Sequence, residues 1–499
     1  MVETEGYTMA HVKTVTTTLD SLPAGAGPEI LENGKLKKVS MPQGVTRKML
    51  LKDIILIAWP SLVELLLTQL TSMADQVMVG RLPGQEGIVA LSAVGLATQP
   101  KFLLMTMIMS LNVGATAVIA RFRGQQNQEK ARQAMRQMML LNVVVGTLFM
   151  MLGLMLSGQL IRLMSGTGVS DETYRAAVRY LNIQLIGFIP LALTSTITAS
   201  LRGIGDSRIP MLYNTVANVA NLILNYVMIY GKLGCPAMGV DGASWATVIG
   251  QTVACVIALG VVFGGKHYLH FEVRKTFRID GSSMRDVVNI GFPAMVEQLF
   301  MRAGVMIFTR AVAGLGDTLY ATHQICMSVQ ALSFMMGQAF AASATTLMGQ
   351  SLGKRREDMA SIYMHYTRSV GLISSVVLGI LIAVFNRGIV AVYNSSPEVI
   401  AAGSGIMLLI AASQPLQATQ FIVSGGLRGA GDTRYTAFVV MITTLGVRSI
   451  LAVLLVTILD WGLWGAWIAL MLDQVMRTVL MVARYDTAKW VKIWGTRRK

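Results

Sequence analysis

Twelve apolar stretches, most of them 20 residues or longer, constrain this chain more than any other feature. They lie at 53–79, 88–117, 137–157, 174–200, 209–230, 240–264, 287–313, 319–349, 364–385, 399–425, 436–458 and 461–484. A helix of about 20 residues crosses the hydrocarbon core of a bilayer. Only 14% of the residues are charged, against about 25% in soluble globular proteins. We therefore predict an all-α integral membrane protein, because a backbone exposed to lipid must satisfy its own hydrogen bonds.

The distribution of Lys and Arg gives these spans an orientation. If the N-terminus is cytoplasmic, the inside segments hold 31 of the 42 Lys and Arg residues, and the outside connections hold six. Such a bias is typical of membrane proteins, whose cytoplasmic loops are basic. It predicts that both termini are cytoplasmic, and it explains the net charge of +16 without a nucleic-acid partner.

An internal repeat divides the spans into two halves. The sequence LRGIGDSR at 201–208 is matched by LRGAGDTR at 427–434, and Pro60 with Glu64 is matched by Pro293 with Glu297. Because each half has six helices, both halves enter the membrane from the same side, as in a parallel repeat. We predict two six-helix lobes related by a pseudo-twofold axis along the membrane normal, with a central cleft that opens to each side by a rocking motion.

The expected domain organisation follows from the repeat. We expect a disordered cytoplasmic tail without an assigned role at 1–50 and a basic cytoplasmic tail at 486–499. The N-terminal lobe should span 51–264, a cytoplasmic loop 265–286, and the C-terminal lobe 287–485. The three cysteines share no metal-ligand spacing, and no carboxylates are aligned with a nucleophile. We therefore expect that the protein is not an enzyme and that it holds neither a cofactor nor a structural metal. We also expect a monomer in the plasma membrane.

Polar residues inside the spans are the candidate functional residues, because an ionisable side chain there costs at least about 2.5 kcal/mol. Asp75 lies in the outer half of the first span. In the fifth span Asn214, Asn218, Asn221 and Asn225 recur at spacings of 4, 3 and 4, which places them on one helix face. Counting from the helix ends puts Asp75, Asn221 and Asn225 at similar depth. We expect these three to line one polar pocket, and Asn214 and Asn218 to bond between helices.

The other intramembrane polar residues are weaker candidates. Glu64 lies three helical turns before Asp75, and Glu297 occupies the matching position of the second half. We take Glu64, Gln69, Glu297 and Arg302 as candidates for substrate or gate contacts. Asp473 and Arg477 are four residues apart, which favours a structural ion pair.

These motifs together resemble the multidrug and toxic compound extrusion (MATE) family. The resemblance rests on ADQVMVGR at 74–81 after Pro60, the paired LRGxGD loops, NLILNY at 221–226, GVDGA at 239–243 and ATHQI at 321–325. It covers residues 50–485. It implies twelve helices in two lobes and export of organic cations or other amphiphiles, including drugs and toxic metabolites, driven by entry of H⁺ or Na⁺.

The resemblance also implies roles for individual residues. Asp75 falls on the family's first-helix cation-coupling aspartate, and Pro60 falls on the proline about which that helix bends in some members. Asn221 and Asn225 fall on the fifth-helix polar positions, although the DinF-type branch has an aspartate where this chain has Asn225. The second cation site of the NorM-type branch corresponds to Met301 and Gln417 here, and we add these two residues to the candidates for substrate or gate contacts. We therefore expect coupling to depend on Asp75, with H⁺ or Na⁺ as the ion.

Three other classes of function stay open from the sequence. A flippase for lipid-linked oligosaccharides shares the two-lobe plan and would be expected to carry basic residues in the cleft, for which Arg302 and Arg448 are the candidates. A channel is disfavoured because the repeat is a pair of large lobes rather than a pore loop. A receptor or structural protein would show no flux driven by a gradient.

Overall fold

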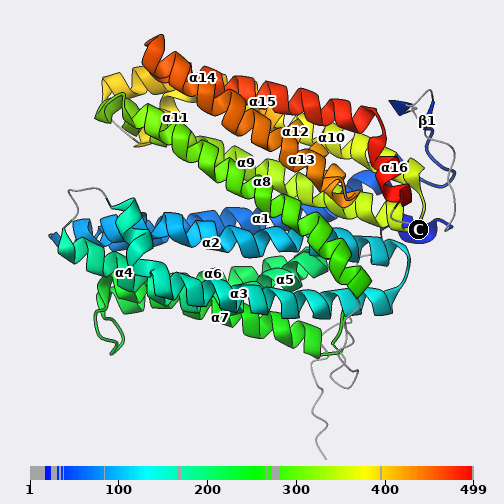
Figure 1. The fold of residues 1–499 in the computed structure, drawn as a ribbon, viewed down its shortest axis with the longest axis horizontal. Helices are drawn as coiled ribbons and strands as arrows, with labels where there is room; N and C mark the ends of the chain where they lie inside the picture. The colour runs from blue at the N-terminus through cyan, green and yellow to red at the C-terminus, as the bar shows by residue number, and fades with distance from the viewer. Residues whose placement is uncertain are drawn as a thin grey trace, which may run out of the picture.

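The computed structural model describes most of the chain and places it in two helical bundles (Figure 1). The described residues are 17–23, 31–32, 35–36, 39–83, 85–165, 170–265, 267–271, 281–393 and 396–496. The predicted tail at 1–50, the loop at 265–286 and the tail at 486–499 lie partly outside these ranges.

The N-terminal lobe is formed by seven helices. They are α1 (Arg47–Gly80), α2 (Gln85–Gly124), α3 (Gln128–Met164), α4 (Asp171–Ile186), α5 (Phe188–Gly203), α6 (Arg208–Tyr230) and α7 (Gly239–Phe263). The span predicted at 174–200 is the pair α4 and α5, which bends by 46° at Gly187. Local sequence sets several ends: the Thr46 hydroxyl accepts from the backbone N–H of Met49 at the start of α1, and Gly231 ends α6 in the left-handed conformation that suits glycine.

The C-terminal lobe repeats this arrangement. It contains α8 (Gly281–Ala313), α9 (Asp317–Gly353), α10 (Glu357–Val384), α11 (Asn386–Tyr393), α12 (Pro397–Gly429), α13 (Thr433–Val440), α14 (Ile450–Val453) and α15 (Gly462–Asp486). The span predicted at 436–458 also includes two π-helical segments, η2 (Met441–Ser449) and η3 (Leu454–Ile458). The short helix α16 (Lys489–Thr496) follows α15.

The described helices account for the twelve predicted spans. Nine are long and apolar enough to cross a membrane, or ten if α4 and α5 form one bent span. The remaining two spans are α1 and α6, with 34 and 23 residues. α1 carries Asp75 and α6 carries the asparagine stripe. The two spans that are not among the nine or ten are therefore the ones that hold the polar residues of the site.

The lobes meet closely at the end of the molecule where α16 lies and diverge toward the end where α4 and α11 lie (Figure 1). Two glycines allow this contact. A Cβ atom on Gly124 would lie 2.0 Å from the carbonyl oxygen of Gln350, and one on Gly353 would lie 2.1 Å from that of Arg121. These two contacts occupy equivalent positions in the two halves of the repeat, so α2 and α9 cross here about the pseudo-twofold axis.

Polar contacts reinforce the same seam between the lobes. The Ser343 hydroxyl donates to the Ile54 carbonyl at 3.3 Å, and the Thr346 hydroxyl donates to the Arg202 carbonyl at 2.9 Å. The Gln350 amide donates to the Gly203 carbonyl at 3.0 Å. The structure is therefore closed at the end that carries α16.

The N-terminal region differs in part from the disordered tail that we expected. Residues 17–22, here called the strap, contain the 3₁₀ turn η1 (Thr18–Ser21) and pack into the closed seam, where Leu19 is buried. A two-residue hairpin, β1 (Leu31–Glu32) with β2 (Lys35–Leu36), follows. The reason for the difference is tertiary: Leu19 joins an apolar cluster with α1, α9 and α10 that the local sequence does not reveal.

Candidate functional site

Asp75 and the outer asparagines form one hydrogen-bonded chain inside the N-terminal lobe. The amide of Asn225 donates to Asp75 Oδ1, and also to Asn221 Oδ1 at 3.1 Å. The amide of Asn221 in turn donates to the hydroxyl of Thr247 on α7 at 3.4 Å. Asn221 and Asn225 are buried, whereas Asp75 is partly buried. The structure therefore brings these three residues together as expected, in a polar cluster that is called the Asp75 pocket below.

The asparagine stripe fixes how α6 lies against α1. Asn214 donates to Glu64 at 2.8 Å, Asn218 donates to Thr68 at 3.4 Å, and Asn225 donates to Asp75. Each pair is separated by 150 residues, so the two helices run parallel and in register. The prediction that Asn214 and Asn218 bond between helices is confirmed.

Lys101 brings a positive charge to the same pocket. It projects from α2, beside Pro100, and its ammonium donates to Gln184 Oε1 on α4 at 2.7 Å. It lies close enough to Asp75 for their charges to interact, and Tyr180 on α4 also faces Asp75. The Asn225 Oδ1 and Gln184 Nε2 atoms are buried and have no partner among the described residues. The pocket therefore combines a carboxylate, an ammonium and two amide groups that can each form a further hydrogen bond.

The sequence analysis assigned no role to Lys101, Gln184, Tyr180 or Thr247. A lysine in an apolar span is itself a signal, because such residues usually face the interior of the bundle and a partner. Its partner could not be named, because Gln184 is 83 residues away in the chain.

Glu64 and Glu297, candidates for substrate or gate contacts, are engaged in ion pairs within the lobes. Glu64 accepts from Arg202 at 2.7 Å in addition to Asn214. Glu297 accepts from Arg428, and from the hydroxyl of Thr436 at 3.1 Å. Arg202 and Arg428 are the arginines of the two LRGxGD loops. The sequence repeat therefore encodes a repeated ion pair, in which each lobe ties its first helix to one of these loops.

The other candidates are spread over both lobes. Gln69 is partly buried on α1, and Pro60 lies inside α1, which continues through it as one helix. Gln417 is buried and accepts from Gln330 at 2.9 Å, while Met301 packs against the apolar cluster of α9, α10 and α12. Arg302 lies over the ring of Phe102 on α2, at 5.3 Å. None of these described side chains joins the Asp75 pocket.

A second charged cluster lies inside the C-terminal lobe. Asp473 accepts from Arg477 at 2.8 Å and from Arg448 Nε at 2.9 Å, and Arg477 also donates to Thr444 at 2.6 Å. The prediction of an Asp473–Arg477 ion pair is confirmed, and Arg448 joins it. This pairing turns Arg448 toward Asp473.

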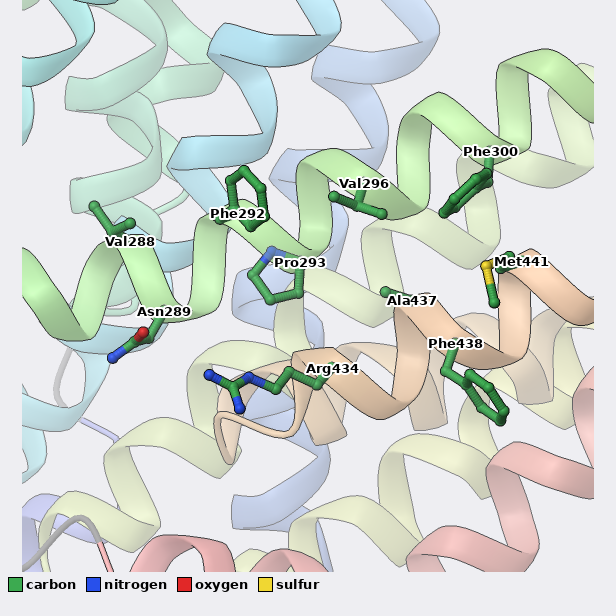
Figure 2. A pocket seen from close by; sticks show the side chains of 10 residues that line it. All are labelled: Val288, Asn289, Phe292, Pro293, Val296, Phe300, Arg434, Ala437, Phe438 and Met441. Atoms are coloured by element: carbon green, nitrogen blue, oxygen red, sulfur yellow. The ribbon is translucent and has the colours of Figure 1, made fainter.

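A groove of about 440 Å³ lies between α8 and α13 in the C-terminal lobe (Figure 2). Its walls are largely apolar, with Phe292, Val296 and Phe300 on α8 opposite Ala437 and Phe438 on α13. Arg434 is the charged side chain among the described residues that line it. The described residues that line the groove include no carboxylate.

Comparison with known proteins decides the family. The MatE family model matches residues 60–227 and 293–454. This chain belongs to the MatE family. The two matched segments begin at Pro60 and Pro293, which are the repeat positions identified from the sequence.

Relatives and solved structures agree along almost the whole chain. The "Probable multidrug resistance protein NorM" of Thermotoga maritima is 29% identical over 442 residues, covering 88% of this chain and 93% of the relative. "Multidrug resistance protein MdtK" of Yersinia pestis is 25% identical over 439 residues, covering 87% and 94%. A crystal structure of MATE in complex with MaD3S superposes with a TM-score of 0.81 at 21% identity, covering 88% of this chain and 97% of that one. The twelve-helix, two-lobe fold is therefore that of the MATE transporters.

Proposed function

We propose that this MATE family member is a secondary active exporter. It would move amphiphilic, often cationic, organic compounds out of the cell in exchange for H⁺ or Na⁺, by rocking its lobes about the closed seam. The relatives named as multidrug resistance proteins support the substrate class. One observation carries the coupling: Asp75, an acid within the membrane, accepts a hydrogen bond from Asn225 inside one lobe. A carboxylate placed in this way can take up a cation or a proton and change its bonding to α6 when it does.

The orientation follows from the basic loops. We assign the end that carries α16 to the cytoplasm of a plasma-membrane protein, because the inside segments hold 31 of the 42 Lys and Arg residues. The described contacts between the lobes at the seam then close the cytoplasmic side, which corresponds to an outward-facing state. In this state Asp75 takes up the coupling ion from outside. Loss of its negative charge weakens the binding of a cationic compound, and the lobes then rock inward for the next one.

The energetics are sufficient for export. One elementary charge that enters down about 100 mV releases about 2.3 kcal/mol, which supports a concentration ratio of about 1.6 decades for a neutral compound. A pH gradient adds to this when the ion is a proton. A transport function without covalent chemistry also agrees with the names of the relatives.

The flippase alternative is less well supported. It requires basic side chains facing the cleft to hold a pyrophosphate, but Arg448 pairs with Asp473 and Arg302 lies against Phe102. Purified protein in liposomes that flips a prenyl-pyrophosphate lipid and moves no dye would establish that function instead.

The test replaces Asp75 with Asn and follows a fluorescent cationic dye in proteoliposomes, with pH and Na⁺ gradients imposed separately. Asp75→Asn keeps the size of the side chain and an oxygen that can accept the hydrogen bond from Asn225, but it removes the negative charge. Gradient-driven export should therefore be lost. Glu172→Gln, an exposed acid on α4, serves as the matched control and should transport normally. Export by a correctly inserted Asp75→Asn protein at the wild-type rate would refute the proposal.

A further inference from the structure

The ammonium of Lys101 is the charged group in the Asp75 pocket that the coupling scheme above leaves unused. It comes from α2, is held by Gln184 on α4, and faces a carboxylate from α1 that α6 also binds. Four helices, α1, α2, α4 and α6, therefore contribute to one internal polar cluster that contains both charges. Lysines inside membrane-spanning segments are rare because they are costly, and they persist where they pair or serve a function.

We propose that Lys101, held by Gln184, determines ion specificity by keeping a fixed positive charge near Asp75, so that the transporter couples to protons and not to sodium. This inference rests on the proposed function, in which Asp75 carries the coupling step. It concerns the identity of the ion alone.

The electrostatic reason is the net charge of the pocket. Asp75 and Lys101 together are neutral, and the other described groups that face Asp75, Asn225 and Tyr180, are uncharged amide and phenol side chains. A sodium ion would therefore enter a neutral pocket beside a fixed positive charge. Repulsion between like charges at short range is strong where water is scarce. A proton needs no ligand shell and binds directly to the carboxylate.

The proposal also explains how the ion would expel its substrate. A proton on Asp75 leaves the Lys101 ammonium without a counter-charge, so the pocket changes from neutral to positive. A cationic compound in the neighbouring cleft is then repelled. Without Lys101 the same proton would change the pocket only from negative to neutral.

The test compares sodium binding to purified full-length protein, measured as the shift in melting temperature when NaCl replaces choline chloride and by dialysis with radioactive Na⁺. Wild type should show neither a shift nor binding. Lys101→Met, which keeps the length and removes the charge, should bind Na⁺ with an apparent affinity at least about tenfold higher, because repulsion by one nearby like charge in a protein interior is worth more than a decade. Lys101→Arg should behave like wild type, and so should Lys52→Met, an exposed lysine on α1.

Three outcomes separate this inference from the proposed function. Lys101→Met should lose its sodium binding again when Asp75→Asn is added, which places the ion at this pocket. Sodium binding by wild type as strong as that of Lys101→Met, or no binding by either Lys101→Met or Lys101→Gln, would overturn the inference. Undiminished export by Asp75→Asn would instead refute the proposed function, whatever sodium does.

A separate set of contacts concerns the strap, residues 17–22, which binds both lobes at the closed seam. In the N-terminal lobe, the backbone N–H of Thr18 donates to Asp53 on α1 at 2.8 Å, and Asp20 pairs with Arg123 on α2 at 3.2 Å. From the C-terminal lobe, the ammonium of Lys354 donates to the Leu19 carbonyl.

Two further features join the lobes at the same point. Tyr363 on α10 donates to the same Asp53 carboxylate at 2.6 Å, so one acid serves the strap and both lobes. The Leu19 side chain is 3% exposed among Ile54, Ile57, Leu347 and Tyr363. Separation of the lobes at this end would break all of these contacts.

We infer that the strap stabilises closure of this seam and must leave it before the lobes separate there. The inference rests on the alternating access of the proposed function. The test uses full-length protein with Cys235, Cys255 and Cys326 changed to Ser and with Ser343→Cys as a reporter, since Ser343 is fully buried in the seam. Its rate of labelling by a polar thiol reagent reports opening.

Leu19→Asp should raise the labelling rate by about tenfold, as expected when a minor open state of about 1% becomes 10% populated. Leu19→Ala should raise it by less, and it covers the case in which the aspartate variant does not fold. Ser40→Asp, an exposed position in the same N-terminal region, is the control and should change nothing. Unchanged labelling in both Leu19 variants would overturn the role of the strap. Dye export by wild type with no labelling under any gradient would refute opening at this seam instead.

Discussion

Replacing Glu297 with Gln tests whether the repeated ion pairs are structural. Glu297 is 1% exposed and accepts from Arg428 Nη2 and from Thr436, and the Arg428 Nε atom has no partner among the described residues. Glutamine keeps the size but leaves the Arg428 charge without compensation. Breaking one side of a buried pair costs about 3–5 kcal/mol. We take the lower end, about 3 kcal/mol, because the arginine side chain retains 15% exposure.

This cost converts into a measurable change in melting temperature. For a cooperative unit of about 200 residues, 1 kcal/mol shifts the melting temperature by about 2–4 °C, so Glu297→Gln should lower it by roughly 6–12 °C. The assay is intrinsic fluorescence of detergent-purified protein at one fixed scan rate, because membrane proteins of this size commonly unfold irreversibly. Glu398→Gln, an exposed acid at the start of α12, is the matched control.

A double-mutant cycle isolates the pair. Arg428→Met removes the unpaired charge, so the double variant should lose less than the sum of the two single losses, by about 0.5–3 kcal/mol. Glu64→Gln should cost less than Glu297→Gln, because the Glu64 side chain is 10% exposed and that of Glu297 is 2% exposed. A melting temperature within about 2 °C of wild type, together with a large change in drug affinity, would refute the structural role and restore Glu297 as a gate.

Three further predictions concern the seam and the C-terminal lobe. Gly124→Ala should weaken the crossing of α2 and α9, because its Cβ would lie 2.0 Å from a backbone oxygen, and Gly353→Ala should weaken the crossing equally. Both variants should raise the rate of thiol labelling in the Ser343→Cys protein. Asp473→Asn leaves Arg448 and Arg477 buried together and should cost about 3–5 kcal/mol in the same melting assay, whereas a loss below about 1 kcal/mol would contradict the ion-pair assignment. Burial lowers the pKa of Lys354 from its ordinary value of 10.5. Between the lowered pKa and 10.5 the unfolded chain binds more protons than the folded chain, so the stability of the folded state should rise with pH. This rise should be absent in Lys354→Met.

The sequence by itself determined the architecture. Long apolar runs, the asymmetry of Lys and Arg and the LRGxGD repeat are local or periodic signals, and they predicted helices, two lobes and a family that the comparisons confirm. The asparagine spacing on α6 predicted a polar face, and the depth of Asp75 predicted which asparagines it would meet. These inferences succeeded because a helix of known pitch places residues on faces without any knowledge of the rest of the fold.

The tertiary structure decided which polar groups pair. Glu64 and Glu297 were candidates for substrate or gate contacts, a role that stays a prediction. Their arginine partners lie more than 130 residues away, so the ion pairs within the lobes appear only once α1 and α8 are packed. Lys101 reaches the Asp75 pocket because α2 packs beside α4, and Leu19 is ordered because three helices from two lobes surround it. Pairing in a low-dielectric interior depends on distances across the fold, and helical periodicity specifies faces but not neighbours.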